Sequence, residues 1–158
     1  MQLLLFTLYV LVGFAGMEII SYVVHRYLFH GLLWNIHKSH HEPHHGLFEA
    51  NDLFSVFFAL VSMALMYIGS ADPLGSFSFA VGLGIAIYGI LYFIIHDLFA
   101  HKRFVPFKSD STIMKLIRRA HQNHHQSVEK DGQEPYGLFL FPYDEYPEFE
   151  RKRDRKEP

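Results

Sequence analysis

The residues of this sequence best suited to chemistry are its histidines, which fall into four clusters with two repeated spacings. The chain of 158 residues contains 12 histidines and no cysteine. Two of the clusters are pairs spaced H-x4-H, and two are triads spaced H-x2-H-H. The pairs are His25/His30 and His96/His101, and the triads are His37/His40/His41 and His121/His124/His125. Repeated spacings of this kind indicate a set of ligands rather than isolated polar residues at a surface.

A set of imidazoles this large indicates a metal centre with more than one ion. Imidazole nitrogen suits zinc, copper, iron and nickel, and the lack of cysteine excludes thiolate ligands and disulfides. A closed tetrahedral zinc site takes about four ligands, whereas the clusters contain ten histidines. Two redox-active ions with open positions can reduce O2 and attack a C–H bond, so an oxygenase is the chemistry we expect.

The two spacings place different demands on the backbone. On an α-helix the positions i, i+3 and i+4 share a face, so we expect each triad to present three imidazoles toward one point. The i, i+5 spacing of the pairs separates two rings by about 140° on an ideal helix. Each pair can therefore converge on one site only where a helix end unwinds or contains a π-type turn.

Two other kinds of histidine-rich membrane protein remain open at this point. A protein that binds haem between two histidines would carry its pairs inside apolar spans, facing across the bundle. A histidine-rich metal-binding or transport protein would carry carboxylates or histidines within the spans to mark a pathway. The clusters in this sequence instead follow the ends of apolar runs.

Three apolar runs are expected to position the clusters, at residues 3–24, 53–70 and 77–95. Each is close to the roughly 20 helical residues that cross a hydrocarbon core of about 30 Å. A signal peptide is the alternative for the first run, but a basic N-terminal region is missing and the run is long for one. The turn at 71–75 is short enough to predict a helical hairpin, and Gly82, Gly84 and Gly89 should allow close helix packing.

The hairpin fixes a topology in which residues 25–52 and 96–158 lie on the same side of the membrane. These two regions contain every lysine, arginine and histidine of the chain. The positive-inside rule then places them in the cytoplasm. We therefore expect an all-α fold, an integral membrane helical bundle with a cytoplasmic histidine-rich metal-binding cap. A capping helix is expected at 111–128 and a charged tail at 143–158, within a single domain of residues 1–158.

Several charged or polar residues are candidates for supporting the metal ligands. Glu18 is the ionisable residue of the first run and lies on the same helix face as His25, seven residues later. It could accept the free N–H of a ligand imidazole, or form a helix–helix hydrogen bond while protonated. Asp97, Glu42, Asn51 and Asp52 are further candidates, although Asn51 and Asp52 could instead cap the next helix. The aromatic residues Phe54, Phe57, Phe58, Tyr88, Tyr92 and Phe93 could line a tunnel or simply pack.

The sequence around the histidines resembles that of the bacterial β-carotene hydroxylases, within the fatty acid hydroxylase/sterol desaturase superfamily. The resemblance covers roughly residues 13–140. The matching stretches are Gly16-Met17-Glu18, His25-Arg26-Tyr27-Leu28-Phe29-His30-Gly31, Trp34, His37-Lys38-Ser39-His40-His41-Glu42-Pro43, Phe48-Glu49-Ala50-Asn51-Asp52-Leu53, Tyr88-Gly89-Ile90-Leu91-Tyr92-Phe93, His96-Asp97 and Ala120-His121 with His124-His125.

The resemblance implies a non-haem di-iron monooxygenase that adds a hydroxyl group at carbon 3 of the β-ionone ring. It would convert β-carotene, drawn from the bilayer, to β-cryptoxanthin and zeaxanthin with O2 and electrons from reduced ferredoxin. Zinc can replace the two iron ions in such a site during purification. The ligand role is carried to all ten clustered histidines but not to His44 and His45.

The location implied is the bacterial inner membrane, and no nucleic-acid partner is expected from a net charge of −2. A fatty acid or sterol hydroxylase or desaturase with the same two-metal site is the alternative function.

Overall fold

In the computed structural model all regular secondary structure of the described residues is helical, and the described residues are all except 43–45, 47, 106, 128 and 142–158. The helices in chain order are α1 (Gln2–Val23), η1 (Val24–Leu32), α2 (Trp34–His41), α3 (Asp52–Ile68), α4 (Phe77–Tyr92), η2 (Phe93–Ala100) and α5 (Thr112–His124). The all-α prediction is confirmed for this part of the chain. His44, His45 and the charged tail at 143–158 lie outside the described residues.

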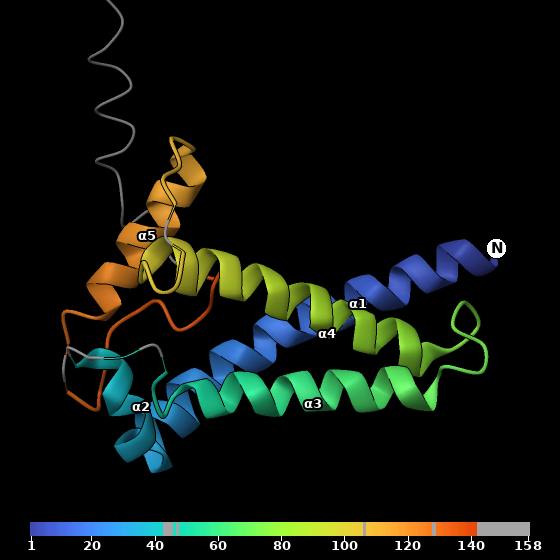
Figure 1. The fold of residues 1–158 in the computed structure, drawn as a ribbon, viewed down its shortest axis with the longest axis horizontal. Coiled ribbons are helices and arrows are strands. Elements are labelled where there is room, and N and C mark those ends of the chain that lie inside the picture. Colours follow the sequence, from blue (N-terminus) through green and yellow to red (C-terminus); the bar gives the residue numbers. More distant parts are fainter. Residues whose placement is uncertain (43–45, 47, 106, 128, 142–158) are drawn as a thin grey trace, which may run out of the picture.

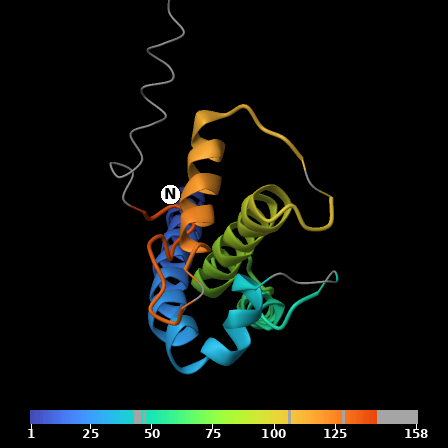
Figure 2. The same cartoon turned by 90° about the vertical axis from the view of Figure 1, so that its left-hand side faces the viewer.

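Three rods and a cap make up the molecule (Figure 1). The rods are α1 with η1, α3, and α4 with η2, and α4 packs against both α1 and α3. The N-terminus and the turn between α3 and α4 lie at one end of the rods, and α2 and α5 lie at the other (Figure 1). Figure 2 looks onto the end that carries α2 and α5. The predicted hairpin therefore brings both histidine-bearing regions to one end of the bundle.

The helical hairpin begins its second arm with a side-chain cap. The hydroxyl of Ser76 accepts a hydrogen bond from the backbone N–H of Phe79 at 3.2 Å, which satisfies one of the free amides of the first turn of α4.

The capping helix α5 also agrees with the sequence, since Ile117 and Ala120 of its apolar stripe are buried. Ile113 departs from that stripe, because 66% of its surface is exposed.

The outer surface of the rods is apolar. Two continuous helices, Gln2–Leu32 and Phe77–Ala100, are long and apolar enough to cross a membrane, and α3 is a shorter apolar helix of 17 residues. Leu11, Phe57 and Ile90 are each more than half exposed. An extended apolar surface of this kind is stable against lipid and unfavourable in water, so the outer surface is that of a membrane protein.

Glycines set the distance between the rods. A Cβ atom added at Gly13 of α1 would overlap the backbone of Val81 in α4, and one added at Gly84 would overlap the backbone of Val10. Gly82 is similarly close to Ser62 of α3. The prediction of close packing at Gly82 and Gly84 is confirmed, as expected for small residues at helix interfaces in membranes. Gly89 differs, because a Cβ atom there would meet nothing within 4 Å.

A cluster of buried apolar side chains joins the rods to the cap. It consists of Met17, Tyr88, Ile95, Ile117, Ala120, Leu138 and Phe141. These residues come from α1, α4, η2, α5 and the segment that follows α5. The cap is thus held onto the end of the bundle by burial of apolar surface, which is the main favourable term in folding.

Candidate metal centre

Both H-x4-H pairs lie at π-helices that continue α1 and α4: His25, His30 and His96 are within η1 and η2, and His101 is the residue that caps the C-terminal end of η2. A π-helix closes its hydrogen bonds between residues five apart, so such residues stack one turn apart. The backbone N–H of His101 accordingly donates to the carbonyl of His96 at 2.9 Å. The ring centroids of His25 and His30 are 5.1 Å apart, and those of His96 and His101 are 4.6 Å apart. The helix distortion that the spacing required is present in both pairs.

The clustered histidines assemble into two groups with converging donor atoms. Within each group the ligand atoms all lie within 4.8 Å of one another. The first group consists of His25, His30, His37, His41 and His124, and the second group of His40, His96, His101 and His121. Each group draws on residues that are far apart in the sequence, so neither could form without the folded cap.

Each H-x2-H-H triad is divided between the two groups, which corrects the prediction that a triad points at one ion. His37 and His41 belong to the first group and His40 to the second. On a helix, position i+4 lies about 40° to one side of position i, and position i+3 lies about 60° to the other. The ring of His40 is therefore turned about 100° from that of His41, which is enough to direct it into the other group.

His125 stands between the two groups. Its ring centroid lies 4.4 Å from that of His41 in the first group and 4.4 Å from that of His121 in the second. Its Nε2 atom is buried and has no hydrogen-bond partner among the described residues. All ten histidines expected from the sequence therefore gather in one continuous cluster, with His125 placed to serve either group.

The Nδ1 atoms of the first group point outward at hydrogen-bond acceptors. Four of them face backbone carbonyls of the segment after α5: His25 faces Tyr136 at 2.7 Å, His30 faces Lys130 at 3.0 Å, His41 faces Ser127 at 3.0 Å, and His124 faces Gln133. The fifth, on His37, lies 2.7 Å from the side-chain oxygen of Asn51. A carbonyl oxygen only accepts, so each Nδ1 carries the hydrogen and each Nε2 keeps a free lone pair.

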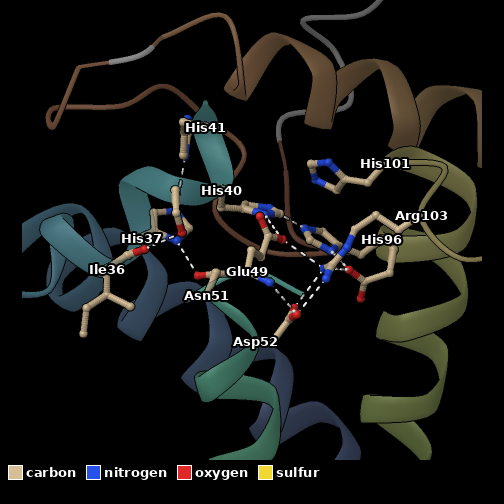
Figure 3. Close-up of polar contacts among 12 residues, drawn as sticks. Ile36, His37, His40, His41, Glu49, Asn51, Asp52, His96, His101 and Arg103 are labelled. Carbon is tan, nitrogen blue, oxygen red and sulfur yellow. Dashed lines mark hydrogen bonds and ion pairs between the residues drawn. The ribbon is translucent and has the colours of Figure 1, made fainter. Parts of the chain in front are cut away.

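The second group is supported by carboxylates instead (Figure 3). The Nδ1–H of His40 donates to Glu49 at 2.9 Å, and Arg103 donates to the same oxygen of Glu49 at 2.9 Å. Arg103 also pairs with Asp97 at 2.8 Å and with Asp52 at 2.7 Å. Burial raises the pKa of Glu49 while the Arg103 charge opposes that rise, and the hydrogen bond to Asp52 raises the pKa of Arg103.

The distances between facing Nε2 atoms fit a metal ion in each group. His37 lies 3.0 Å from His25 and 3.2 Å from His41, and in the second group His40 lies 3.1 Å from His96. Metal–imidazole bonds of about 2.1 Å place neighbouring ligand nitrogens about 3 Å apart.

Without a cation between them, the facing lone pairs would repel one another. A shared proton does not replace the cation, because burial lowers the pKa of His37 to about 3 and that of His41 to about 4. The donor set therefore fits two ions held by nitrogen.

Glu18 has a different role from the one expected. It does not accept from a ligand imidazole; its Oε1 accepts the backbone N–H groups of Phe139 and Leu140, each at 2.8 Å. Its helix face meets the segment after α5 rather than the imidazole rings. Glu42 is also away from the centre, since it pairs with Lys38 at 3.0 Å on the surface.

Asn51 and Asp97, in contrast, lie beside the histidine groups. Asp52 is connected to the second group through its ion pair with Arg103. The side chain of Asn51 makes no capping hydrogen bond at the start of α3, because its oxygen faces His37. Arg103 and Glu49 were not among the supporting residues expected from the sequence. Arg103 follows His101 in an irregular segment, and no spacing connects it with Glu49, 54 residues earlier.

An apolar cavity of about 460 Å³ lies between α1, α3 and α4 and extends as far as residues that contact the histidine groups. Five of the six aromatic residues considered from the sequence line it, namely Phe54, Phe58, Tyr88, Tyr92 and Phe93, whereas Phe57 does not. Asn51 and Asp97 form its polar end. The ring of Tyr92 stacks on that of His96, with 4.3 Å between centroids, so the cavity and the second group share a wall.

Comparisons with known proteins agree with this arrangement. The family model described as fatty acid hydroxylase matches residues 10–146. The chain is 40% identical to the β-carotene hydroxylase of Pantoea ananas over 141 residues, or 85% of this chain and 77% of that protein. It is 39% identical to the β-carotene hydroxylase of Pseudescherichia vulneris over 136 residues, or 84% of this chain and 74% of that protein.

A plant relative is longer than this chain. The chloroplastic β-carotene 3-hydroxylase 2 of Arabidopsis thaliana is 40% identical over 131 residues, which are 81% of this chain but 43% of that protein. The chain therefore spans less than half the length of that relative. No solved structure matches the chain.

Proposed function

The chain belongs to the fatty acid hydroxylase family, where it groups with the β-carotene hydroxylases, and on that premise we propose that it hydroxylates β-carotene. The reaction adds a hydroxyl group at carbon 3 of the β-ionone ring, giving β-cryptoxanthin and then, at the second ring, zeaxanthin. The observation that carries this proposal is the apolar cavity of about 460 Å³, whose lining includes Asn51, which bonds to His37 of the first group, and Tyr92, which stacks on His96 of the second.

The redox centre of the proposed reaction is a pair of iron ions held by the ten histidines. When bound, iron supplies the electron transfer to O2 that a hydroxylation needs. For each C–H bond, one O2, two electrons and two protons give one C–OH group and one water. The electrons come from an external reductant of the ferredoxin type. Zinc suits the same nitrogen ligands, so a purified sample can carry zinc in place of iron.

The protein's own residues orient the ligands and exclude water. The carbonyls after α5 hold the hydrogen on Nδ1 in the first group, which keeps each Nε2 directed at the ion. Glu49 does the same for His40 in the second group. Tyr92 lines the cavity and stacks on His96, so the cavity and the second group share this side chain. The apolar lining of the cavity excludes water from the long hydrocarbon substrate and positions the substrate's ring beside the ions.

The substrate enters from the lipid in this proposal, and the enzyme is a multi-pass protein of the bacterial inner membrane. Support comes from the apolar outer surface and the bacterial relatives. Three passes, by α1, α3 and α4, leave the histidine groups on the side that carries every lysine and arginine. By the positive-inside rule that side is the cytoplasm, where a soluble electron donor can reach the centre.

Pigment analysis tests the proposal. Expression in bacteria engineered to make β-carotene is expected to yield zeaxanthin, with β-cryptoxanthin as the intermediate. His124→Ala removes a fully buried member of the first group and is expected to leave β-carotene unchanged. Unchanged β-carotene with well-expressed, iron-loaded wild-type protein would refute the proposal. A change in fatty acids or sterols in that strain would instead favour the alternative hydroxylase or desaturase.

A further inference from the structure

The first group depends on one segment for most of its outer hydrogen bonds. We name this segment the strap; it comprises residues 127 and 129–141. Its backbone carbonyls accept from four of the five Nδ1 atoms of the group. The described residues of the strap form no helix, so its conformation depends on what holds it in place.

One face of the first rod holds the strap. Glu18 accepts two backbone N–H groups of the strap, from Phe139 and Leu140, each at 2.8 Å. One and two helical turns further along, Tyr22 and Arg26 both donate to Glu134, at 2.6 and 2.7 Å. Residues four apart share a helix face, so these three side chains form a single row beneath the strap.

Glu18 is the strongest member of this row. Only 5% of its surface is exposed, whereas the side chains of Arg26 and Glu134 are 42% and 32% exposed. An exposed ion pair contributes little to stability because water screens it. Two hydrogen bonds to one buried carboxyl group are shielded from that competition. Among the polar contacts of the strap, those of Glu18 therefore contribute most to its position, and through it to the direction of the first group's imidazoles.

The second group is supported by separate residues. Glu49 holds the Nδ1–H of His40 and is itself held by Arg103. Arg103 reaches Asp52 at the start of α3 and Asp97 in η2, so it ties together the two rods beside the second group (Figure 3). These four residues belong to the loop before α3, to α3, to η2 and to the segment after η2. None of them belongs to the strap.

We propose that the two metal positions are supported independently, with Glu18 acting through the strap as the positioning residue of the first group, and Arg103 acting through Glu49 as that of the second. The proposal rests on the two-ion centre proposed above. Loss of either residue releases one ion and leaves the other in place. Neither residue belongs to a histidine group, and neither is among the residues that line the cavity.

Metal affinity measured on the purified full-length protein tests the proposal. Removing a residue that orients a ligand lowers metal affinity by about 10- to 100-fold. Glu18→Gln and Arg103→Met are each expected to release one of two ions to a chelator at a concentration that strips neither from wild type. Glu18→Leu should release the first ion more completely than Glu18→Gln, because glutamine keeps an acceptor oxygen. Arg103→Lys should recover part of the loss seen with Arg103→Met.

Cobalt(II) substitution identifies which ion is lost. The absorption spectra of Glu18→Gln and Arg103→Met, each with one ion, should differ from each other and add up to the wild-type spectrum. Ser78→Ala, which removes a partly buried hydroxyl that donates to Leu65 between α3 and α4, is the control for Glu18→Gln. Lys115→Met, which removes a surface ion pair with Asp110, is the control for Arg103→Met. Both controls should keep two ions.

The outcomes separate this inference from the proposed function. Wild type could hold two ions while Glu18→Gln and Arg103→Met each lose both ions or lose neither. Either result would overturn independent support and would leave the two-ion centre unaffected. Identical cobalt spectra for the two single-ion variants would also overturn it. Fewer than two ions in fully loaded wild type would refute the two-ion centre itself. Each variant must elute from a sizing column in detergent as a monodisperse species. Glu18→Gln keeps the size of the side chain and an acceptor oxygen, so this variant guards against failure to fold.

Discussion

Gly89→Leu should block the cavity without disturbing the helices. Gly89 lines the cavity, and a Cβ atom added there meets no other atom within 4 Å. A leucine side chain adds four carbon atoms. Each occupies a volume comparable to that of one water molecule in the liquid, which is roughly 30 Å³. The side chain therefore fills roughly 120 Å³, about a quarter of the cavity of about 460 Å³.

The loss of volume should displace the substrate ring from the histidine groups. Ligand cavities are typically about 300 to 1,000 Å³, so the remaining space would be near the lower limit. A displacement of about 1 Å can lower a rate by about 100-fold. We expect kcat/KM for β-carotene to fall by about that factor in Gly89→Leu, while the iron content stays at the wild-type value because no ligand or supporting residue is touched.

Purified protein, β-carotene in detergent micelles and chromatographic quantification of the hydroxylated products give the required rates. Gly16→Leu is the matched control, because a Cβ atom at Gly16 also meets nothing within 4 Å and Gly16 is not among the residues that line the cavity. Its turnover should remain within about twofold of wild type. Equal turnover by Gly89→Leu and Gly16→Leu would refute the assignment of this cavity to the substrate.

Three further predictions concern the metal groups and the helix packing. His40→Ala and His41→Ala should both abolish zeaxanthin formation, yet their cobalt(II) spectra should differ because the two residues belong to different groups; matching spectra would contradict the division of the triad. Chelation should lower the melting temperature, with a loss of about 4 kcal/mol of folding stability for each ion that was present at 1,000 times its dissociation constant, and restored metal should reverse it; an unchanged melting temperature would mean that the facing nitrogens need no cation. Gly13→Leu should destabilise the bundle by about 1–3 kcal/mol or more, since its side chain overlaps the backbone of Val81; a melting temperature equal to that of Gly16→Leu would argue against close contact there.

Much of the fold and most of the ligand set could be predicted from local sequence features. The lengths of the apolar runs and the short turn at 71–75 predicted the helical hairpin, and α3 and α4 confirm it. The i, i+5 spacing required a π-type turn for the pairs to converge, and η1 and η2 provide it. These features follow from helix geometry within one segment, so the sequence is sufficient to reveal them.

The partition of the histidines and their supports could not be predicted in the same way. A shared helix face placed His37, His40 and His41 together, but the two histidine groups are adjacent, so a difference of about 100° in direction decides which group a ring joins. Which group each ring faces depends on how α2 is rotated against the rods. Glu18 likewise meets residues more than 100 positions later. Contacts of that range are set by the packed cap and leave no local pattern.

Isotope labelling of the product tests the central claim most directly. Purified, iron-loaded protein would be given β-carotene, a chemical or ferredoxin-type reductant, and O2 labelled with ¹⁸O, and the product would be examined by mass spectrometry. Zeaxanthin in which both hydroxyl oxygens carry the label is the expected product. Unlabelled hydroxyl groups, or unchanged β-carotene in a sample shown to hold two iron ions per chain, would contradict that claim.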